Sequence, residues 1–206
     1  MFDGVLRRSF DPAINAMAKK LVRRCVSAEQ VTFAGLIFGL GAAAAIAFGW
    51  PLGVALAGLA LSRLADGLDG AVARLTSPTG RGAFFDILCD FVFYGAMPLA
   101  FALDAPETNA LPAAVLLFAF YINGASFLGF AAVAAGQGMT TEQRGTKGLY
   151  YTAGLAEGAE TILCFLLMIL FPAQFPWLAY GFALLCGITT VSRAMLAWDL
   201  LGRSGR

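Results

Sequence analysis

The sequence has 206 residues, of which 59% are hydrophobic and 13% are charged, with a formal net charge of +1. Soluble domains are about 45–50% apolar with glycine included and about 25% charged, so this composition argues against a water-soluble enzyme and indicates a membrane protein. The sequence contains no histidine, which excludes histidine-based zinc sites, serine–histidine–aspartate triads and histidine-ligated haem. Any chemistry must use carboxylates, hydroxyls, lysine, arginine or cysteine. The near-neutral charge gives no general attraction to nucleic acid.

The first segment, residues 5–26, has the pattern of an amphipathic helix. Apolar residues recur at helical spacing from Leu6 to Leu21, and six Lys and Arg residues surround them. This pattern is typical of a helix that lies in the membrane interface. Because the segment lacks the short apolar core and cleavage site of a signal peptide, we expect it to be retained.

Six apolar segments follow, each close to the roughly 20 residues that a helix needs to cross a bilayer. They are residues 31–49, 51–74, 83–103, 110–136, 148–171 and 175–197. The sequence therefore predicts an all-α integral membrane bundle of six transmembrane helices, forming a single domain over residues 1–206. We expect an interfacial helix at residues 1–26, the six transmembrane helices within 27–198 and a cytoplasmic tail at 199–206.

Small residues in the first span recur at every fourth position, at Gly35, Gly39 and Ala43. This spacing places them on one helix face. Such a face lets two helix backbones approach closely inside a membrane, so it predicts tight packing of the first span against a neighbour.

The distribution of positive charge supports this topology, because short cytoplasmic loops collect lysine and arginine. Of the 14 Lys and Arg residues, six precede the first span, three lie near the joint of the second and third spans, two lie between the fourth and fifth, and three lie near the C-terminal end. The three joints on the opposite side contain none. We therefore expect a multi-pass protein of the cell inner (plasma) membrane with both termini in the cytoplasm.

Four aspartates occur where the second span ends and the third begins. Asp66 and Asp69 are three residues apart, and Asp86 and Asp90 are four apart, so each pair lies on one face of its helix. Ionisable residues at membrane depth are costly and indicate a functional site. Four carboxylates that converge at low dielectric require protonation or bound cations. All-oxygen ligands favour Mg²⁺ or Mn²⁺, and two such ions are a common device for displacement at phosphorus.

A structural alternative is that these acids only pair with Arg63, Arg74 and Arg81 and cap two helices at the interface. Helix capping does not need four acids at this depth, which favours the metal site. Between the two pairs, Gly70 leaves room for a bulky group against the helix, and Arg74 can neutralise a phosphate.

The stretch DGLDGAVARLTSPTGRGAFFDILCD, residues 66–90, resembles the signature of the CDP-alcohol phosphatidyltransferase family, DxxDGxxAR followed by seven or eight residues and GxxxDxxxD. All eight fixed positions match, with seven residues between the two halves. These positions are Asp66, Asp69, Gly70, Ala73, Arg74, Gly82, Asp86 and Asp90. The run of residues 147–161 also resembles that of a bacterial subgroup of the family, which narrows the subgroup without naming its acceptor.

The resemblance implies a transferase of phospholipid biosynthesis. In that reaction the hydroxyl of a small alcohol displaces CMP from a CDP-linked lipid such as CDP-diacylglycerol, and a new phosphodiester forms. The resemblance implies two divalent ions, Mg²⁺ or Mn²⁺, held by Asp66, Asp69, Asp86 and Asp90. It further implies that Asp90 is the catalytic base for the acceptor hydroxyl. Since members of the family are often dimers, a homodimer is also implied.

Further positions are implied to contact the nucleotide and its phosphates. They are Gly70, Arg74, Thr79 and Gly82. The family often has a Pro-Asn-x-x-Thr element before the first span, and its counterpart here, residues 28–32, keeps Thr32 but lacks the proline and the asparagine. A binding role for this segment therefore stands beside a purely structural interpretation, in which Ser27 and Gln30 form a capping box that begins a helix.

Two further acids in the fifth span, Glu157 and Glu160, share a helix face and are candidates for the acceptor side of the site. As anions they would repel a phosphorylated alcohol and suit serine, ethanolamine, choline or a free polyol. Arg144, Lys147 and Arg193 could instead form a phosphate-binding cluster, which would suit glycerol phosphate or inositol phosphate. Pairing of the glutamates with Arg193 is the structural alternative.

Two other functions remain open on the sequence. One is a membrane transporter or a non-catalytic scaffold that keeps the fold, although the intact motif and the lack of paired broken helices argue against it. The other is metal-dependent hydrolysis of a phosphodiester, with water in place of the alcohol. The products distinguish the three functions. Phosphatidyl transfer gives a lipid with a new headgroup, hydrolysis gives phosphatidic acid, and a transporter or scaffold gives no product.

Overall fold

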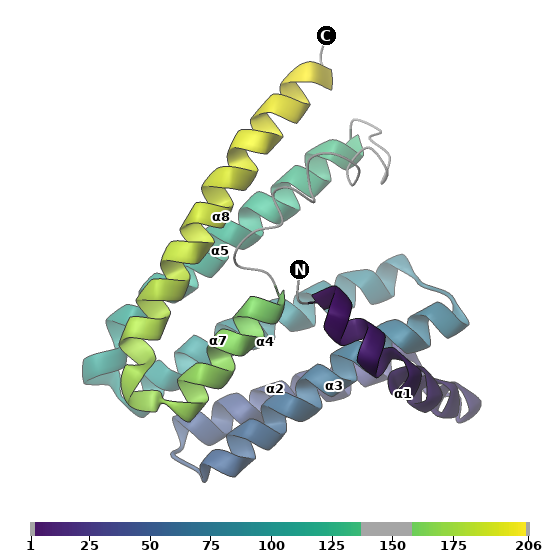
Figure 1. Ribbon diagram of the computed structural model, residues 1–206, viewed down its shortest axis with the longest axis horizontal. Coiled ribbons are helices and arrows are strands. Elements are labelled where there is room, and N and C mark those ends of the chain that lie inside the picture. Colours follow the sequence, from purple (N-terminus) through teal and green to yellow (C-terminus); the bar gives the residue numbers. More distant parts are fainter. Residues whose placement is uncertain (1–2, 137–157, 205–206) are drawn as a thin grey trace. The chain divides into compact units, whose positions relative to one another are not determined.

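A computed structural model describes the backbone of residues 3–136 and 158–204 (Figure 1). Its helices are α1 (Asp3–Arg23), α2 (Ala28–Ala47), α3 (Leu52–Thr76), α4 (Gly80–Asp104), α5 (Pro106–Gly136), α7 (Gly158–Leu170), the short 3-10 helix η2 (Pro172–Gln174) and α8 (Phe175–Ser204). Within these ranges there is no strand, which confirms the prediction of an all-α fold. The chain divides into two compact units, Met1–Ala110 and Leu111–Arg206.

Among the described residues, four helical stretches are long and apolar enough to cross a membrane, namely α2, α4, α5 and Pro172–Asp199. The described part of the predicted fifth span, α7, is a shorter apolar helix of 13 residues. Helix α3 has 25 residues, which corresponds to about 37 Å at 1.5 Å per residue. That length is sufficient for a span, but the charged residues in its second half lower its hydropathy. The remainder of the predicted fifth span lies outside the described residues.

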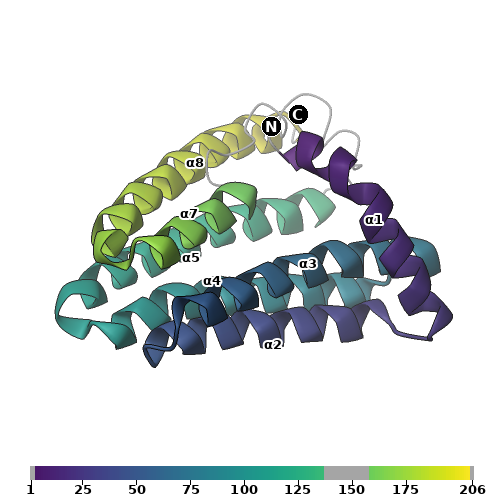
Figure 2. The ribbon, with the colours of Figure 1, turned by 60° about the horizontal axis from the view of Figure 1, so that its bottom comes forward.

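In the first unit, α2, α3 and α4 lie side by side (Figures 1 and 2). The small residues of α2 produce the predicted close packing: a Cβ atom on Gly35 would lie 3.0 Å from the Cβ of Ala65, and one on Gly39 would lie 2.6 Å from the ring of Phe93. Gly49 adopts a φ of +63° in the turn between α2 and α3, a conformation that glycine reaches without steric cost. Glycines therefore set both the spacing and the reversal of these helices.

Helix α1 is inclined to α2, α3 and α4 and lies at one end of them (Figure 2). Its Ala18 is fully buried in a cluster with Ala71 and Val72 of α3. After α1 ends at Arg23, the chain turns back to α2, whose first turn is closed by the predicted capping box of Ser27 and Gln30. The α1–α2 joint is thus held beside the C-terminal half of α3.

The second unit contains most of α5, together with α7 and α8. Phe120 of α5 contacts Phe165 of α7 and Phe182 of α8, with edge-to-face rings whose centroids lie 6.1 Å apart in both pairs. Such aromatic contacts stabilise packing beyond the area that they bury. These rings form part of the core between the three helices.

Candidate active site

Three of the four predicted metal ligands come together between α3 and α4. Asp66 of α3 and Asp86 and Asp90 of α4 each offer a carboxylate oxygen, and these oxygens all lie within 4.8 Å of one another. They line a cavity of about 10 Å³. A cavity of this size holds roughly one water-sized sphere. The donor set and the space therefore suit a small hard cation such as Mg²⁺ or Mn²⁺.

The fourth predicted ligand, Asp69, lies one helical turn further along α3 and is 6% exposed. Its Oδ2 accepts a hydrogen bond of 2.7 Å from the hydroxyl of Thr32 on α2. The Thr32 hydroxyl also lies 3.0 Å from the carbonyl oxygen of Ala28, so it is fixed at the first turn of α2. Thr32 therefore orients Asp69, and this contact ties α2 to the motif.

Arg63 lies beside the acids, one turn before Asp66 on α3. Its Nη1 is 3.8 Å from Asp66 Oδ1 and 3.7 Å from Asp90 Oδ1. Its guanidinium carbon is 4.6 Å from the centre of the Phe93 ring, and its Nη2 donates a hydrogen bond to the Ser62 hydroxyl. Of the three arginines in the structural alternative, Arg63 thus lies close to two of the acids.

The other two arginines of that alternative do not pair with the motif acids in the part of the chain that the structure describes. Arg81 lies 3.4 Å from Glu29 of α2 instead. Arg74 lies beside Gly70, since a Cβ atom on that glycine would be 3.4 Å from Arg74 Nη1. One arginine balances one acid charge at most, so most of the negative charge at the motif is left for other cations.

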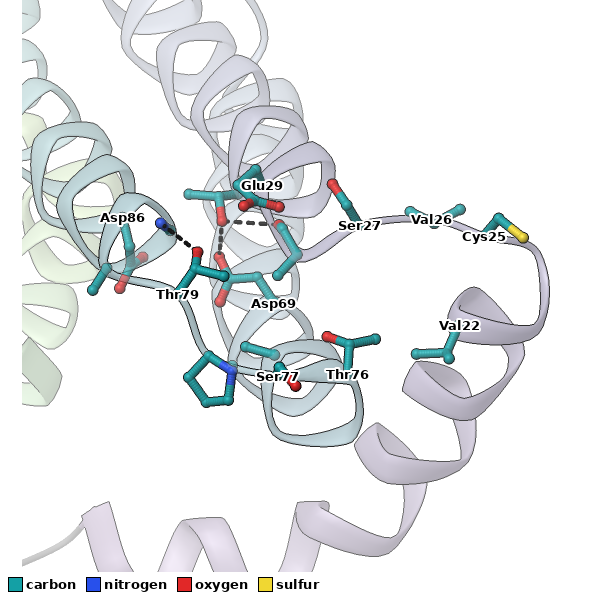
Figure 3. Close-up of a pocket in the computed structure, with 17 residues that line it drawn as sticks. Val22, Cys25, Val26, Ser27, Glu29, Asp69, Thr76, Ser77, Thr79 and Asp86 are labelled. Carbon is teal, nitrogen blue, oxygen red and sulfur yellow. Dashed lines mark hydrogen bonds between the residues drawn. The ribbon is translucent and has the colours of Figure 1, made fainter.

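A larger pocket, with a volume of about 530 Å³, lies next to the acids (Figure 3). Its wall is built from the end of α1, the start of α2, the last turns of α3, the α3–α4 connection and the start of α4. Asp69 and Asp86 line this pocket as well as the small cavity. The carboxylates thus form a common wall between a space of the size of a nucleotide and a space of the size of an ion.

Four of the five predicted substrate-binding residues line this pocket. They are Thr32, Gly70, Thr79 and Gly82. Arg74 is not among its described lining residues. Thr79 is the N-cap of α4: its side-chain oxygen accepts a hydrogen bond of 3.0 Å from the Gly82 amide. A Cβ atom on Gly82 would lie 3.1 Å from that oxygen, so glycine keeps this helix start compact.

Sequence reasoning missed the part of the wall that comes from the end of α1 and the residues just after it, whereas Glu29 lies in the segment 28–32 for which a binding role was left open. Val22, Cys25 and Glu29 line the pocket and are labelled in Figure 3. Cys25 has a φ of 57° and is exposed, whereas the other described cysteines are buried. The amphipathic pattern of residues 5–26 predicted a helix but not the surface against which it packs. For Glu29 the available signal was its place in the counterpart of the family element, where Ala28 and Glu29 replace the proline and the asparagine.

Two of the five predicted acceptor-side residues are described, and both lie in the second unit. Arg144, Lys147 and Glu157 lie outside the described residues. Glu160 lies in the first turn of α7, where its Oε2 is buried. Arg193 of α8 donates from Nη1 to the carbonyl oxygen and side-chain oxygen of Asn123 and to the Ser126 hydroxyl, all within 3.1 Å. In the second unit Arg193 therefore joins α8 to α5.

Comparison with known proteins agrees with the motif. Residues 25–197 match the family model for CDP-alcohol phosphatidyltransferase. The chain is also 44% identical over 193 residues to the inner membrane protein YnjF of Escherichia coli (strain K12), a match that covers 94% of this chain and 93% of that protein. The matched range 25–197 includes all eight motif positions and every lining residue of the two cavities except Val22. The chain therefore belongs to the CDP-alcohol phosphatidyltransferase family.

Proposed function

We propose that this protein transfers a phosphatidyl group from CDP-diacylglycerol to the hydroxyl of a small alcohol and releases CMP. The observation that carries the proposal is the common carboxylate wall between the 10 Å³ cavity and the 530 Å³ pocket. A nucleotide in the larger pocket would place its diphosphate beside the acids. Metal-assisted displacement at phosphorus needs this arrangement of a nucleotide site next to a cation site.

The clustered carboxylates of Asp66, Asp86 and Asp90 would hold divalent ions, with Asp69 as the fourth ligand. Three oxygens within 4.8 Å of one another make such a site favourable, since a single arginine does not balance their charge. Mg²⁺ or Mn²⁺ bound there supplies electrostatic stabilisation of the negative charge that develops on the departing CMP. Thr32 contributes by keeping the Asp69 carboxylate turned toward the common wall.

The larger pocket would bind the cytidine nucleotide. Gly70 leaves an open surface on α3 for the nucleotide, and Arg74, one turn away, would reach its phosphates. Thr32, Thr79 and Gly82 complete the proposed contact set at the starts of α2 and α4. The diacylglycerol portion would remain among the apolar helix surfaces, which are exposed along the whole unit.

Asp90 would act as the catalytic base. Its carboxylate accepts the proton of the acceptor hydroxyl, whose oxygen then forms a bond to the phosphorus of the phosphatidyl group. The bond between that phosphorus and the oxygen of CMP breaks, and CMP leaves with the electron pair. Asp90 suits this role because it lies on the side of the cluster away from the larger pocket: it lines the small cavity, while Asp69 and Asp86 line both.

We further propose the membrane arrangement that the charge pattern predicts. Residues 1–206 form one domain, with α1 in the interface, six spans that include α3 and the segment containing α7, and both termini in the cytoplasm. The name of the relative YnjF describes an inner membrane protein, which supports the same location for this chain. A homodimer is part of the same proposal.

The acceptor is proposed to bind near Glu160 and Arg193, together with Arg144, Lys147 and Glu157. Arg193 Nη1 already makes three contacts with Asn123 and Ser126, which favours an uncharged or amine-bearing alcohol over a phosphorylated one. Serine, ethanolamine, choline and free polyols are therefore the first candidates, and glycerol phosphate and inositol phosphate are the alternatives.

The experiment is to measure CMP release from CDP-diacylglycerol by the purified protein with Mg²⁺ or Mn²⁺ against each of these acceptors in turn. Acceptor-dependent release that Asp90→Asn lacks would support the proposal and identify the alcohol. Release without an acceptor would favour hydrolysis, and full activity of Asp90→Asn would refute the assignment of the base. Absence of release with every acceptor would favour a transporter or scaffold that has kept the metal site.

A further inference from the structure

Arg63 is a charged residue of α3, one of the proposed spans, that the motif does not include. It precedes Asp66 by three positions on α3, and it lines the 10 Å³ cavity with the acids. Its side chain is 21% exposed, and its Nε atom is buried without a hydrogen-bond partner. A partly buried arginine in a span is costly, so its position beside the proposed cation site calls for a role.

The contacts of Arg63 fall into two groups. Two of them hold the guanidinium independently of the acids: the Ser62 hydroxyl accepts from Nη2 at 3.1 Å, and the Phe93 ring lies 4.6 Å below the guanidinium carbon. The distances from Nη1 to Asp66 and Asp90, 3.8 and 3.7 Å, are too long for hydrogen bonds. The attraction to the acids is therefore electrostatic, and the acids can exchange it for another cation while the arginine stays in place.

The support for Arg63 reaches back to α2. Gly39 is packed so closely that a Cβ atom there would lie 2.6 Å from the Phe93 ring and 3.0 Å from the Ser62 hydroxyl oxygen. Ser62 is fully buried and Phe93 is 1% exposed. The two groups that hold the guanidinium are thus fixed between three helices, so its position does not depend on the carboxylates.

We propose that Arg63 is a built-in counter-cation of the metal centre, which holds Asp66 and Asp90 together before divalent ions bind and afterwards competes with those ions for the same carboxylates. The inference rests on the proposed function, because it takes these acids to be the metal ligands. A fixed positive charge less than 4 Å from two ligand oxygens lowers their affinity for a second cation by Coulomb repulsion.

The competition has a consequence for the order of binding. A bound CDP-lipid brings the negative charge of its diphosphate to the common wall, and this charge offsets the guanidinium. The divalent ions would therefore bind weakly to the empty site and more tightly once the nucleotide is present. Arg63 thus couples occupation of the metal centre to occupation of the 530 Å³ pocket.

The test compares Mn²⁺ binding to the full-length protein in detergent, measured by electron paramagnetic resonance titration, for the wild type, Arg63→Gln, Arg63→Met and Arg63→Lys. Both neutral variants should bind Mn²⁺ at least about tenfold more tightly than the wild type, whereas Arg63→Lys should stay within about threefold. Arg81→Gln is the matched control, because it removes a charge that pairs with Glu29 rather than with the cluster. Its Mn²⁺ affinity should stay within about twofold of the wild type.

Thermal unfolding gives a second measurement that a merely structural role would not reproduce. Without metal, the neutral variants should melt at a lower temperature than the wild type, because the carboxylates have lost their counter-cation. Saturating Mn²⁺ should then raise their melting temperature by more than it raises that of the wild type. A neutral variant that stays unfolded in saturating Mn²⁺ would overturn the proposal, since the metal should replace the missing charge.

The outcomes separate this inference from the proposed function. Equal or weaker Mn²⁺ binding by both neutral variants would overturn the role of Arg63 and leave the metal centre intact. A wild-type protein that binds no Mn²⁺, with or without CDP-diacylglycerol, would overturn the proposed metal centre itself. Stronger Mn²⁺ binding by the wild type in the presence of CDP-diacylglycerol, with a smaller gain in Arg63→Met, is the result expected for the coupling.

Discussion

Replacement of Thr32 by valine tests how the start of α2 controls the acids. Valine keeps the shape of the side chain but removes the hydroxyl, which donates a hydrogen bond of 2.7 Å to Asp69 Oδ2. Both partners are nearly enclosed, with Thr32 8% and Asp69 6% exposed, so water cannot readily replace the lost donor. We expect Asp69 to turn away from the common wall and the transferase activity to fall.

The size of the effect follows from the type of bond. A hydrogen bond to a charged group contributes about 1.5–3 kcal/mol, and about 1.4 kcal/mol corresponds to a tenfold change. If the hydroxyl supports Asp69 in the transition state, Thr32→Val should lower kcat/KM by about 10- to 100-fold. Thr32→Ser keeps the donor and should stay within about threefold of the wild type.

The assay is CMP release at several concentrations of Mg²⁺ and CDP-diacylglycerol, with circular dichroism in detergent as a check of the fold. Thr32→Val should need more Mg²⁺ for half-maximal rate, because the oriented carboxylate is a proposed ligand. Activity and Mg²⁺ requirement equal to those of the wild type would refute the reasoning. An equal loss in Thr32→Ser would show that packing at this position matters rather than the hydroxyl.

Three further predictions use the geometry of the first unit. Gly70→Leu fills part of the 530 Å³ pocket and should raise the KM for CDP-diacylglycerol at least about tenfold. Its control is Gly53→Leu, which faces open space on the same helix and should leave this KM unchanged. Equal KM values for the two variants would contradict the placement of the nucleotide. Cys25 is exposed and lines the same pocket, so CMP with Mg²⁺ should slow its reaction with a maleimide; an unchanged labelling rate at saturating CMP would argue against nucleotide binding there. Gly39→Ala places a Cβ atom 2.6 Å from an aromatic ring of α4 and should lower the melting temperature in detergent by roughly 2–10 °C. Gly41→Ala, whose Cβ atom would have nothing within 4 Å, should not lower it. Matching melting curves for the two variants would show that the ring can move aside.

Local patterns predicted much of the fold because they depend on neighbouring residues in the chain. The Ser27 capping box fixes the start of α2, and the small residues Gly35 and Gly39 mark the face that packs against its neighbours. The break between the segments 31–49 and 51–74 falls at the reversal into α3, where Gly49 adopts a positive φ. The charge content of α3 hides it from a criterion based on hydropathy alone, although its length suffices for a span.

The site was predicted as a set of residues but not as an arrangement. Spacings of three and four residues place each pair of aspartates on one face of its own helix, yet the packing of α3 against its neighbours decides that Asp69 bonds to Thr32 while Asp66 joins the cluster. The approach of Arg63 depends on Phe93, 30 positions further along the chain, and no local pattern reports such a contact. Long-range packing therefore determines which charges meet.

The most direct test of the central claim is the identity of the lipid product, measured by mass spectrometry after incubation of the purified protein with CDP-diacylglycerol, the acceptors and Mg²⁺. The account predicts one new phosphodiester lipid for each CMP released, no product after removal of divalent metal, and recovery of the product when Mg²⁺ returns. Asp90→Asn should release no CMP and form no new phosphodiester lipid. Phosphatidic acid in amounts equal to CMP would contradict phosphatidyl transfer and indicate hydrolysis, and product formation that persists without divalent metal would contradict the proposed metal centre.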